Sequence, residues 1–472
     1  MPYFVLTYIL GIAGTVVLAA ASGFMAKTVY LAGCVALSVW SSRKNPWDYL
    51  LLTLWVAALT PFARRLVDMV AGWDAKNIML TAPFLVTAPM VPAILQRLRT
   101  IDARGALFPG LAAVCLLYGF IVTLLRGEPV PGLIGVSDWG VPILYYFFTV
   151  AHRDRIGELL QRLPGFVATN MFLLGSYGVF QFVDLPVWDS LWMQNTDVGA
   201  FGAPEAFLVR VFSTLNSPGP FSCWIMVLIV LSFAFTSWLM PFARFAGLLA
   251  LAFTTVRTSW GGLAVAVFIL AVTSGRRVIR YAIAVVVGGL VLVSVVAFVP
   301  KIDDVISQRI ATFNDLQQDG SLLEREEEAS RMQTLIADNP LGVGIGALGR
   351  GTIAAASGQI LFEGAIDDGV LEIFGSLGWL VGFLYCAALI GIALQCARGA
   401  RRFAFQQRVC FAAGVGCLAA LPLTNIVTGV TGTMMWLMFG LASALGSEAD
   451  LSAVQRQHPA RSVQQLGPSP IG

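Results

Sequence analysis

The sequence predicts an all-α polytopic membrane protein with about 12–14 transmembrane helices. Of its 472 residues, 57% are hydrophobic and 12% are charged, and the mean hydropathy is +0.78. A soluble domain carries about 25% charged residues, so the composition excludes an ordinary soluble protein. We therefore expect the lipid bilayer as a partner, and no nucleic acid.

Apolar runs long enough to cross, or nearly cross, a hydrocarbon core of ~30 Å recur along the chain. They fall at about 3–22, 25–42, 48–65, 77–96, 106–125, 133–151, 163–183, 217–240, 243–256, 258–275, 278–299, 368–396, 408–428 and 430–446. The predicted parts are membrane helices over 1–183, a loop over 184–216, membrane helices over 217–299, a large loop with short helices over 300–367, membrane helices over 368–446 and a polar, disordered tail over 447–472.

The distribution of charge predicts the orientation of these helices. If the N-terminus lies in the cytoplasm, the inner face carries 18 of the 30 Lys and Arg residues with 6 of the 27 Asp and Glu residues. The outer face then carries 12 basic and 21 acidic residues. This bias obeys the positive-inside rule. We therefore predict cytoplasmic N- and C-termini, with both long loops on the outer face.

The stretch Ala243–Gly275 is too long for a single crossing. As one helix it would extend ~50 Å at about 1.5 Å per residue, and a single crossing would invert the charge bias after it. We therefore predict a break within Thr254–Gly262, with Arg257 at the junction of two short helices. An ionisable residue there usually faces a wet cavity or an anionic partner. The alternative is an interfacial Arg that extends to lipid headgroups.

Arg210, Arg257 and Arg331 are outer basic residues that lie beside membrane helices or glycine turns. The planar fork of Arg binds two oxygens at once and keeps its proton, which suits a diphosphate. Arg331 ends a stretch predicted to be helical, Leu322–Ala337, so its alternative role is a solvated charge on a helix face.

Asp367 and Asp368 are the best placed groups for proton transfer, because His152 and His458 both fall on the predicted inner face. One of the two Asp residues could instead cap the next helix. Neighbouring like charges can raise one pKa toward that of a useful base. We predict Asp367 as general base, with Asp368 or Glu363 as substitutes.

Two further patterns have structural interpretations. Gly344, Gly346 and Gly349 fit G-x-G-x-x-G, but no strand precedes them, which favours a re-entrant turn over a dinucleotide site. Backbone N–H groups there could still help to hold a phosphate. The seven cysteines lie in or beside apolar runs without metal-ligand spacing, so we interpret them as small buried hydrophobic residues. We predict no metal and no cofactor.

Three blocks within about 205–380 resemble the bacterial O-antigen polymerase and O-antigen ligase superfamily. They are Arg210 followed by Asn216-Ser-Pro-Gly-Pro-Phe221; the break Thr254–Trp260; and Asp338–Gly346 followed by Asp367-Asp368-Gly369-Val370-Leu371-Glu372 and Leu377-Gly378.

The resemblance implies a metal-independent glycosyltransferase of the GT-C kind in the bacterial inner membrane. Its donor would be a glycan on polyprenyl (undecaprenyl) diphosphate, used on the periplasmic face, and a chain-length co-polymerase is a candidate partner. Arg210 and Arg257 match the family arginines that hold the diphosphate. Asn216, Arg331 and Glu363 are further candidates for substrate binding.

Where ligases that attach glycan to lipid A core carry a His-Asn pair, this chain has Asp367-Asp368. That difference favours a polymerase of repeat units for an exopolysaccharide or O-antigen. The alternatives are a ligase to a lipid or protein acceptor and a flippase for lipid-linked oligosaccharide. A flippase would carry charges along a central path in a repeated architecture, whereas the charges here gather on the outer side.

Overall fold

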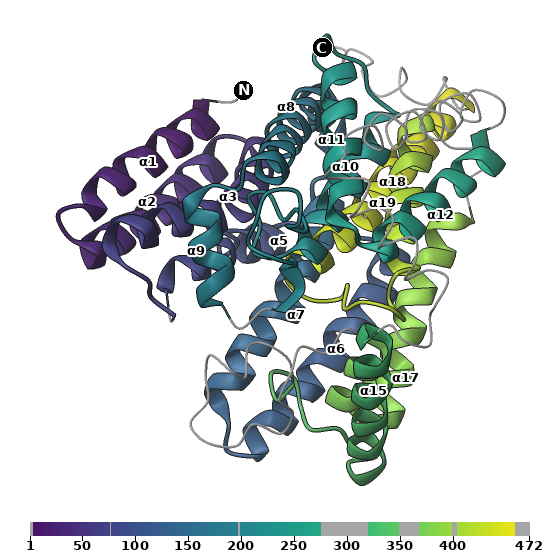
Figure 1. The fold of residues 1–472 in the computed structure, drawn as a ribbon. Helices are drawn as coiled ribbons and strands as arrows, with labels where there is room; N and C mark the ends of the chain where they lie inside the picture. Colours follow the sequence, from purple (N-terminus) through teal and green to yellow (C-terminus); the bar gives the residue numbers. More distant parts are fainter. Residues whose placement is uncertain are drawn as a thin grey trace.

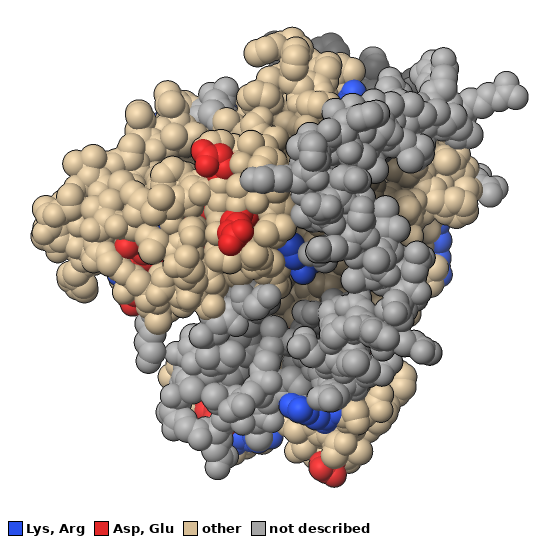
Figure 2. Space-filling view, in the orientation of Figure 1, with Lys and Arg blue, Asp and Glu red and all other residues tan. Residues whose placement is uncertain are grey.

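The structure is a computed structural model that describes residues 3–75, 77–196, 199–274, 320–348, 368–398 and 404–457. The regular secondary structure of these residues is helical. One isolated antiparallel bridge pairs Gly202 with Val209. Nine helical segments of the described chain are long and apolar enough to cross a membrane, and three shorter apolar helices accompany them. Few charged side chains appear among the described residues in Figure 2. The protein is therefore an all-α polytopic membrane protein, which confirms the predicted class.

The first membrane part follows the predicted spans, with one division. Its long helices are α1 (Tyr3–Ala19), α2 (Gly23–Lys44), α3 (Pro46–Ala71), α6 (Ala103–Leu125), α7 (Pro129–Ala151) and α8 (Ile156–Val183). The predicted span 77–96 is divided into η1 (Ile78–Thr81), α4 (Ala82–Leu85) and α5 (Met90–Gln96). Pro83 and Pro89 stand at the starts of α4 and α5. Proline lacks the N–H that a continuous helix would use, so it favours these positions.

The rest of the described chain supplies the helices around the site. They are α9 (Val187–Asn195), η4 (Gly199–Phe201), α10 (Pro218–Ser232), α11 (Met240–Thr254), α12 (Arg257–Ser274), α15 (Gly320–Asp338), α17 (Gly369–Ala397), α18 (Phe405–Leu418) and α19 (Gly429–Gln457). Helix α15 confirms the helix predicted over Leu322–Ala337. The predicted span 278–299 lies outside the described residues. Helix α19 runs past 446 to Gln457, so the first part of the tail predicted to be disordered is helical.

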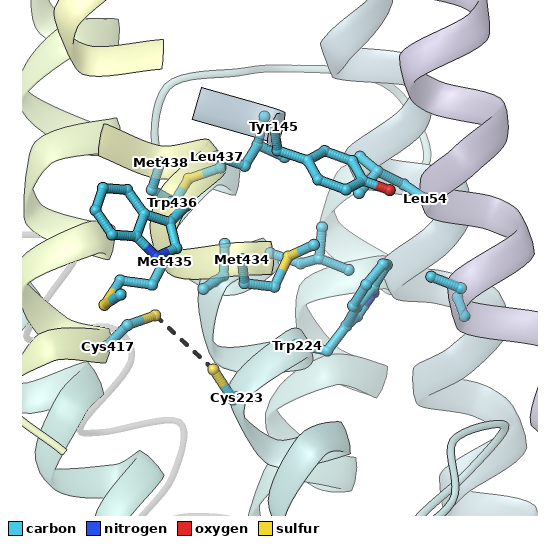
Figure 3. Close-up of a cluster of buried hydrophobic side chains, with 14 of the residues drawn as sticks. Leu54, Tyr145, Cys223, Trp224, Cys417, Met434, Met435, Trp436, Leu437 and Met438 are labelled. Carbon is cyan, nitrogen blue, oxygen red and sulfur yellow. Dashed lines mark hydrogen bonds between the residues drawn. The ribbon is translucent and has the colours of Figure 1, made fainter. Parts of the chain in front are cut away.

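The core lies where α3, α7, α10, α18 and α19 meet (Figure 3). Trp224 of α10 and Trp436 of α19 are fully buried there, and the indole N–H of Trp224 donates to Asn170 Oδ1 of α8 at 2.8 Å. Cys223 and Cys417 lie with their sulfurs 3.8 Å apart across α10 and α18. These cysteines are buried side chains, in agreement with their reading as small hydrophobes. In Figure 1, α1 and α2 pack outside this core, and α15 lies against α17 at the opposite end.

A backbone turn over 340–346 is inserted between the helices α6, α7 and α17. The N–H of Val343 donates to the carbonyl of Gly375 in α17 at 2.9 Å, and the N–H of Ile345 donates to the carbonyl of Gly119 in α6 at 3.2 Å. Buried backbone groups need such partners inside a membrane protein. The turn is therefore held between α6 and α17 by backbone hydrogen bonds to both helices.

Glycine is required in this turn. The φ angles of Gly342, Gly344 and Gly346 are 82°, 89° and 82°. Residues other than glycine rarely adopt this left-handed conformation. A Cβ at Gly346 would also overlap the carbonyl oxygen of Pro131 in α7. The re-entrant turn is confirmed, while Gly349 lies outside the described residues. The N–H groups of 343–345 donate to backbone carbonyls, so these three are not available to a phosphate.

We expect Gly346→Ala to lower the free energy of unfolding by at least about 2 kcal/mol, because it adds left-handed strain to a steric overlap. Thermal unfolding in detergent measures the loss. Gly14→Ala in α1 is the matched control, since a Cβ there meets nothing within 4 Å. Equal melting temperatures for the two variants would contradict the inserted turn.

Candidate functional site

A cavity of about 390 Å³ opens near the centre of the molecule. Its walls come from α3, α7, α17, the segment 215–220, the junction of α11 with α12, and the segment 423–433. Such a cavity lies within the ~300–1,000 Å³ range of small-molecule sites. The charged and amide side chains of its lining come from four distant parts of the sequence, namely Asp138, Arg210, Asn216, Glu372 and Asn425.

Arg210 reaches the cavity from a segment that is fixed at both sides. Its backbone N–H donates to the carbonyl of Phe201 at 2.7 Å, and the next residue, Val211, donates to the carbonyl of Phe253 in α11 at 3.1 Å. The Arg210 side chain donates through Nε to Thr255 Oγ1 at 2.9 Å and to the carbonyl of Thr254 at 3.3 Å. The Arg210 guanidinium thus joins two of the predicted sequence blocks, the one that begins at Arg210 and the helix break within Thr254–Trp260.

The segment behind Arg210 is held by a buried ion pair. Arg65 of α3 bonds Asp189 Oδ1 of α9 and the carbonyl of Ser213, both at 2.6 Å. Asp189 also accepts from Tyr177 at 2.7 Å and from Gln181 at 2.6 Å. Burial raises the pKa of Asp189, and the Arg65 guanidinium opposes this shift by favouring the carboxylate. The pair fixes α9 and the chain at 213 to α3.

The predicted break in Ala243–Gly275 is confirmed. Helix α11 ends at Thr254, Thr255 is left-handed with a φ of 54°, and α12 begins at Arg257. Val256 and Thr258 line the cavity, whereas Arg257 is exposed and does not belong to the lining residues. Arg257 therefore lies at the exposed start of α12, beside the break, and not in the cavity wall that the described residues form.

Two acids in apolar helices line the cavity and were not among the predicted site residues. Glu372 of α17 is buried and accepts a hydrogen bond from the side-chain amide of Asn425. Asp138 of α7 lies on the wall near Gly429. The signal that could have found both acids is their position inside apolar runs, since ionisable residues in such helices usually mark a functional path.

The other predicted residues are placed differently. Asp368 caps α17, accepting from the N–H groups of Val370 at 2.8 Å and Leu371 at 3.1 Å, which is the structural role weighed as its alternative. Arg331 is exposed on α15 and does not line the cavity. Asp367 and Glu363 lie outside the described residues. Among the described residues, no three His, Cys, Asp or Glu side chains form a group that could hold a metal ion.

The fold and the site define a polytopic helical membrane protein with a cavity that is lined by both apolar and charged residues. Residues 242–386 match the family model described as O-antigen ligase, and this match supports membership of the O-antigen ligase and polymerase superfamily. The matched part includes α11, α12, the inserted turn and the start of α17, while Asp138 and Arg210 lie before it. A search among curated proteins finds no match to the chain. The family match supports glycan transfer of the ligase or polymerase type.

We expect Arg65→Met to destabilise the fold by about 3–5 kcal/mol, because it leaves Asp189 buried without its cation. Thermal unfolding in detergent measures the loss, and the double variant Arg65→Met/Asp189→Asn should recover part of it. Arg155→Met is the matched control, because its partner Glu158 is partly exposed and such pairs contribute at most about 1 kcal/mol. A wild-type melting temperature for Arg65→Met would contradict the anchoring role.

Proposed function

We propose that this protein is a polymerase that joins polyprenyl-diphosphate-linked oligosaccharide repeat units on the periplasmic face of the inner membrane. The observation that carries the proposal is the meeting of Arg210 with Asp138 and Glu372 around one cavity. A guanidinium suits the diphosphate of the donor, and a carboxylate suits the proton of an attacking hydroxyl. The charge bias of the loops supports an outer-side location of this cavity.

The proposed reaction is an in-line displacement at the anomeric carbon of the donor sugar. A hydroxyl oxygen of the acceptor forms the new bond to this carbon, and the bond to the diphosphate oxygen breaks. Arg210 stabilises the negative charge that develops on the departing polyprenyl diphosphate. The hydroxyl proton passes to a carboxylate. Because the acceptor and the donor are held together, placement supplies much of the rate enhancement.

Two described carboxylates compete for the role of base. Glu372 is held by Asn425, whose amide fixes one of its carboxylate oxygens, so it is oriented before the substrate binds. Asp138 faces the same cavity from α7. Asp367 remains the base predicted from the sequence, and Arg257 remains a predicted second contact for the diphosphate at the mouth of the break.

Polymerase and ligase activity are distinguished by the acceptor. Purified protein in liposomes is given lipid-linked repeat units alone, and the products are separated by length. A ladder of lipid-linked oligomers supports a polymerase. Single transfer that requires an added lipid or protein acceptor would identify a ligase, and movement of the lipid-linked unit across the bilayer without a new glycosidic bond would identify a flippase.

We expect Arg210→Lys to lower the transfer rate by about 10²-fold and Arg210→Ala by about 10³-fold, because Lys keeps the cation but loses the planar fork. The rate of oligomer formation in liposomes measures the effect. The melting temperatures of both variants show whether the rate falls because the catalytic contact is lost or because the bend between α11 and α12 is destabilised. Arg43→Gln, at an exposed position at the end of α2, is the control and should retain the wild-type rate. Full activity of Arg210→Ala would contradict the proposed donor site.

We expect Glu372→Gln or Asp138→Asn to lower the rate by roughly 10²–10⁴-fold, whichever residue is the base. Gln at 372 still accepts the Asn425 amide, so the fold is retained while the proton acceptor is lost. The decisive measurement is the pH profile of the rate, in which the acidic limb, the fall in rate at low pH as the base becomes protonated, disappears for the variant that removes the base. If both variants keep the wild-type profile, the base lies elsewhere, and Asp367→Asn is then expected to remove the limb.

A further inference from the structure

A second cleft lies between the C-terminal end of α3 and α9, and none of its lining residues lines the central cavity. Its volume is about 240 Å³, and three indoles line it. These are Trp73, Trp188 and Trp192, accompanied by Arg65, Asp68, Met69, Gly72, Leu191 and Asn195. The space is somewhat below the ~300 Å³ at which sites for drug-sized ligands begin, and it suits a ring-sized group.

The indoles are fixed in place by bonds that face the protein. The N–H of Trp192 donates to the carbonyl of Asn216 at 3.2 Å, and the N–H of Trp188 donates to Tyr177 Oη at 2.6 Å. The Arg64 guanidinium lies 4.9 Å from the centre of the Trp73 ring and 4.7 Å from that of Trp192. Interfacial tryptophans of membrane proteins instead place their polar edges at the headgroups. The polar edges of Trp188 and Trp192 are already used within the protein, so these two rings are built into the cleft wall.

Charged groups surround the aromatic lining. Arg64 Nε pairs with Asp68 Oδ2 at 3.0 Å, and Lys27 pairs with Asp74 at 2.6 Å. Asn77 also donates to Asp68 Oδ1 at 2.7 Å. Arg64 and Asp68 are buried and satisfy one another, so these groups fix the shape of the cleft around its aromatic lining. A saccharide fits this cleft, since the C–H face of a sugar ring packs on an indole while its hydroxyls bond to polar groups at the rim such as the exposed amide of Asn195.

The cleft shares a wall with the central cavity. Trp192 lines the cleft, and the residue that accepts its indole N–H, Asn216, lines the cavity. Arg65 of the cleft bonds the carbonyl of Ser213, three residues before Asn216. The geometry points to a saccharide subsite in this cleft, and we propose that it holds a sugar ring of the glycan chain while the reacting end of that chain lies in the central cavity. This proposal rests on the proposed glycan transfer.

The test uses full-length protein in detergent and, as probe, oligosaccharides of one to several repeat units released from the lipid carrier of the source cells. We expect Trp73→Ala to weaken their binding about tenfold, and Trp73→Phe to retain most of it because a stacking face remains. Leu191→Arg fills the cleft from an exposed position and removes none of the ion-paired residues, and should weaken binding equally. Trp238→Ala is the control, at an indole that is 83% exposed between α10 and α11.

The same variants are assayed for transfer with lipid-linked repeat units. The cleft variants should shorten the products by weakening the hold on long chains, while the first addition keeps a rate within about twofold of the wild type. Unchanged binding and unchanged product length in both Trp73→Ala and Leu191→Arg overturn the subsite, as does displacement of the oligosaccharide by phospholipid. If oligosaccharides bind in a Trp73-dependent way but no glycosidic bond is formed by wild-type protein, the subsite stands and the proposed polymerase activity fails.

Discussion

The contact between Arg210 and the helix break is the interaction on which the candidate site depends. Helix α11 ends at Thr254, and the left-handed Thr255 turns the chain into α12. A carbonyl at such an end has no partner within its helix, and an unsatisfied backbone group in a bilayer costs several kcal/mol. Arg210 donates to the Thr254 carbonyl and to Thr255 Oγ1. It thereby stabilises a bend that lipid would disfavour, and the same side chain lines the cavity.

Two other devices hold the surroundings of the cavity. The buried pair of Arg65 and Asp189 fixes α9 and the chain that leads from Arg210 to Asn216. The glycine turn over 340–346 is inserted between α6, α7 and α17. Its last residue, Gly346, lines the cavity. Both devices use backbone or charged groups in a mainly apolar protein, where each must be satisfied internally.

The sequence was sufficient to predict the helical membrane fold, because hydropathy and charge bias act over whole spans. It also predicted the break near Arg257, since a mainly apolar stretch of 33 residues exceeds one crossing and two crossings preserve the charge bias. Proline positions explain the division of 77–96, although the length of that apolar run did not indicate it. The helical continuation of α19 past 446 was missed because the polar composition there is typical of disorder.

The candidate site was only partly predictable. Arg210 and Asn216 could be selected because they stand beside a proline-rich helix start, and both line the cavity. Asp138 and Glu372 were not predicted because the candidate acids were those of the outer loops, whereas these two stand inside or at the start of apolar helices. Asp368 was predicted as a possible base because it adjoins Asp367. In the structure its side chain caps α17. Pairing of Glu372 with Asn425 depends on the packing of distant segments, which no local pattern encodes.

The most direct test of this account is an experimental structure of the protein with a polyprenyl-diphosphate-linked oligosaccharide bound. The account predicts the diphosphate in the central cavity, within hydrogen-bonding distance of the Arg210 guanidinium and on the side of the membrane that holds α9. A diphosphate bound at the opposite face of the membrane, or in the cavity but out of reach of Arg210, would contradict it.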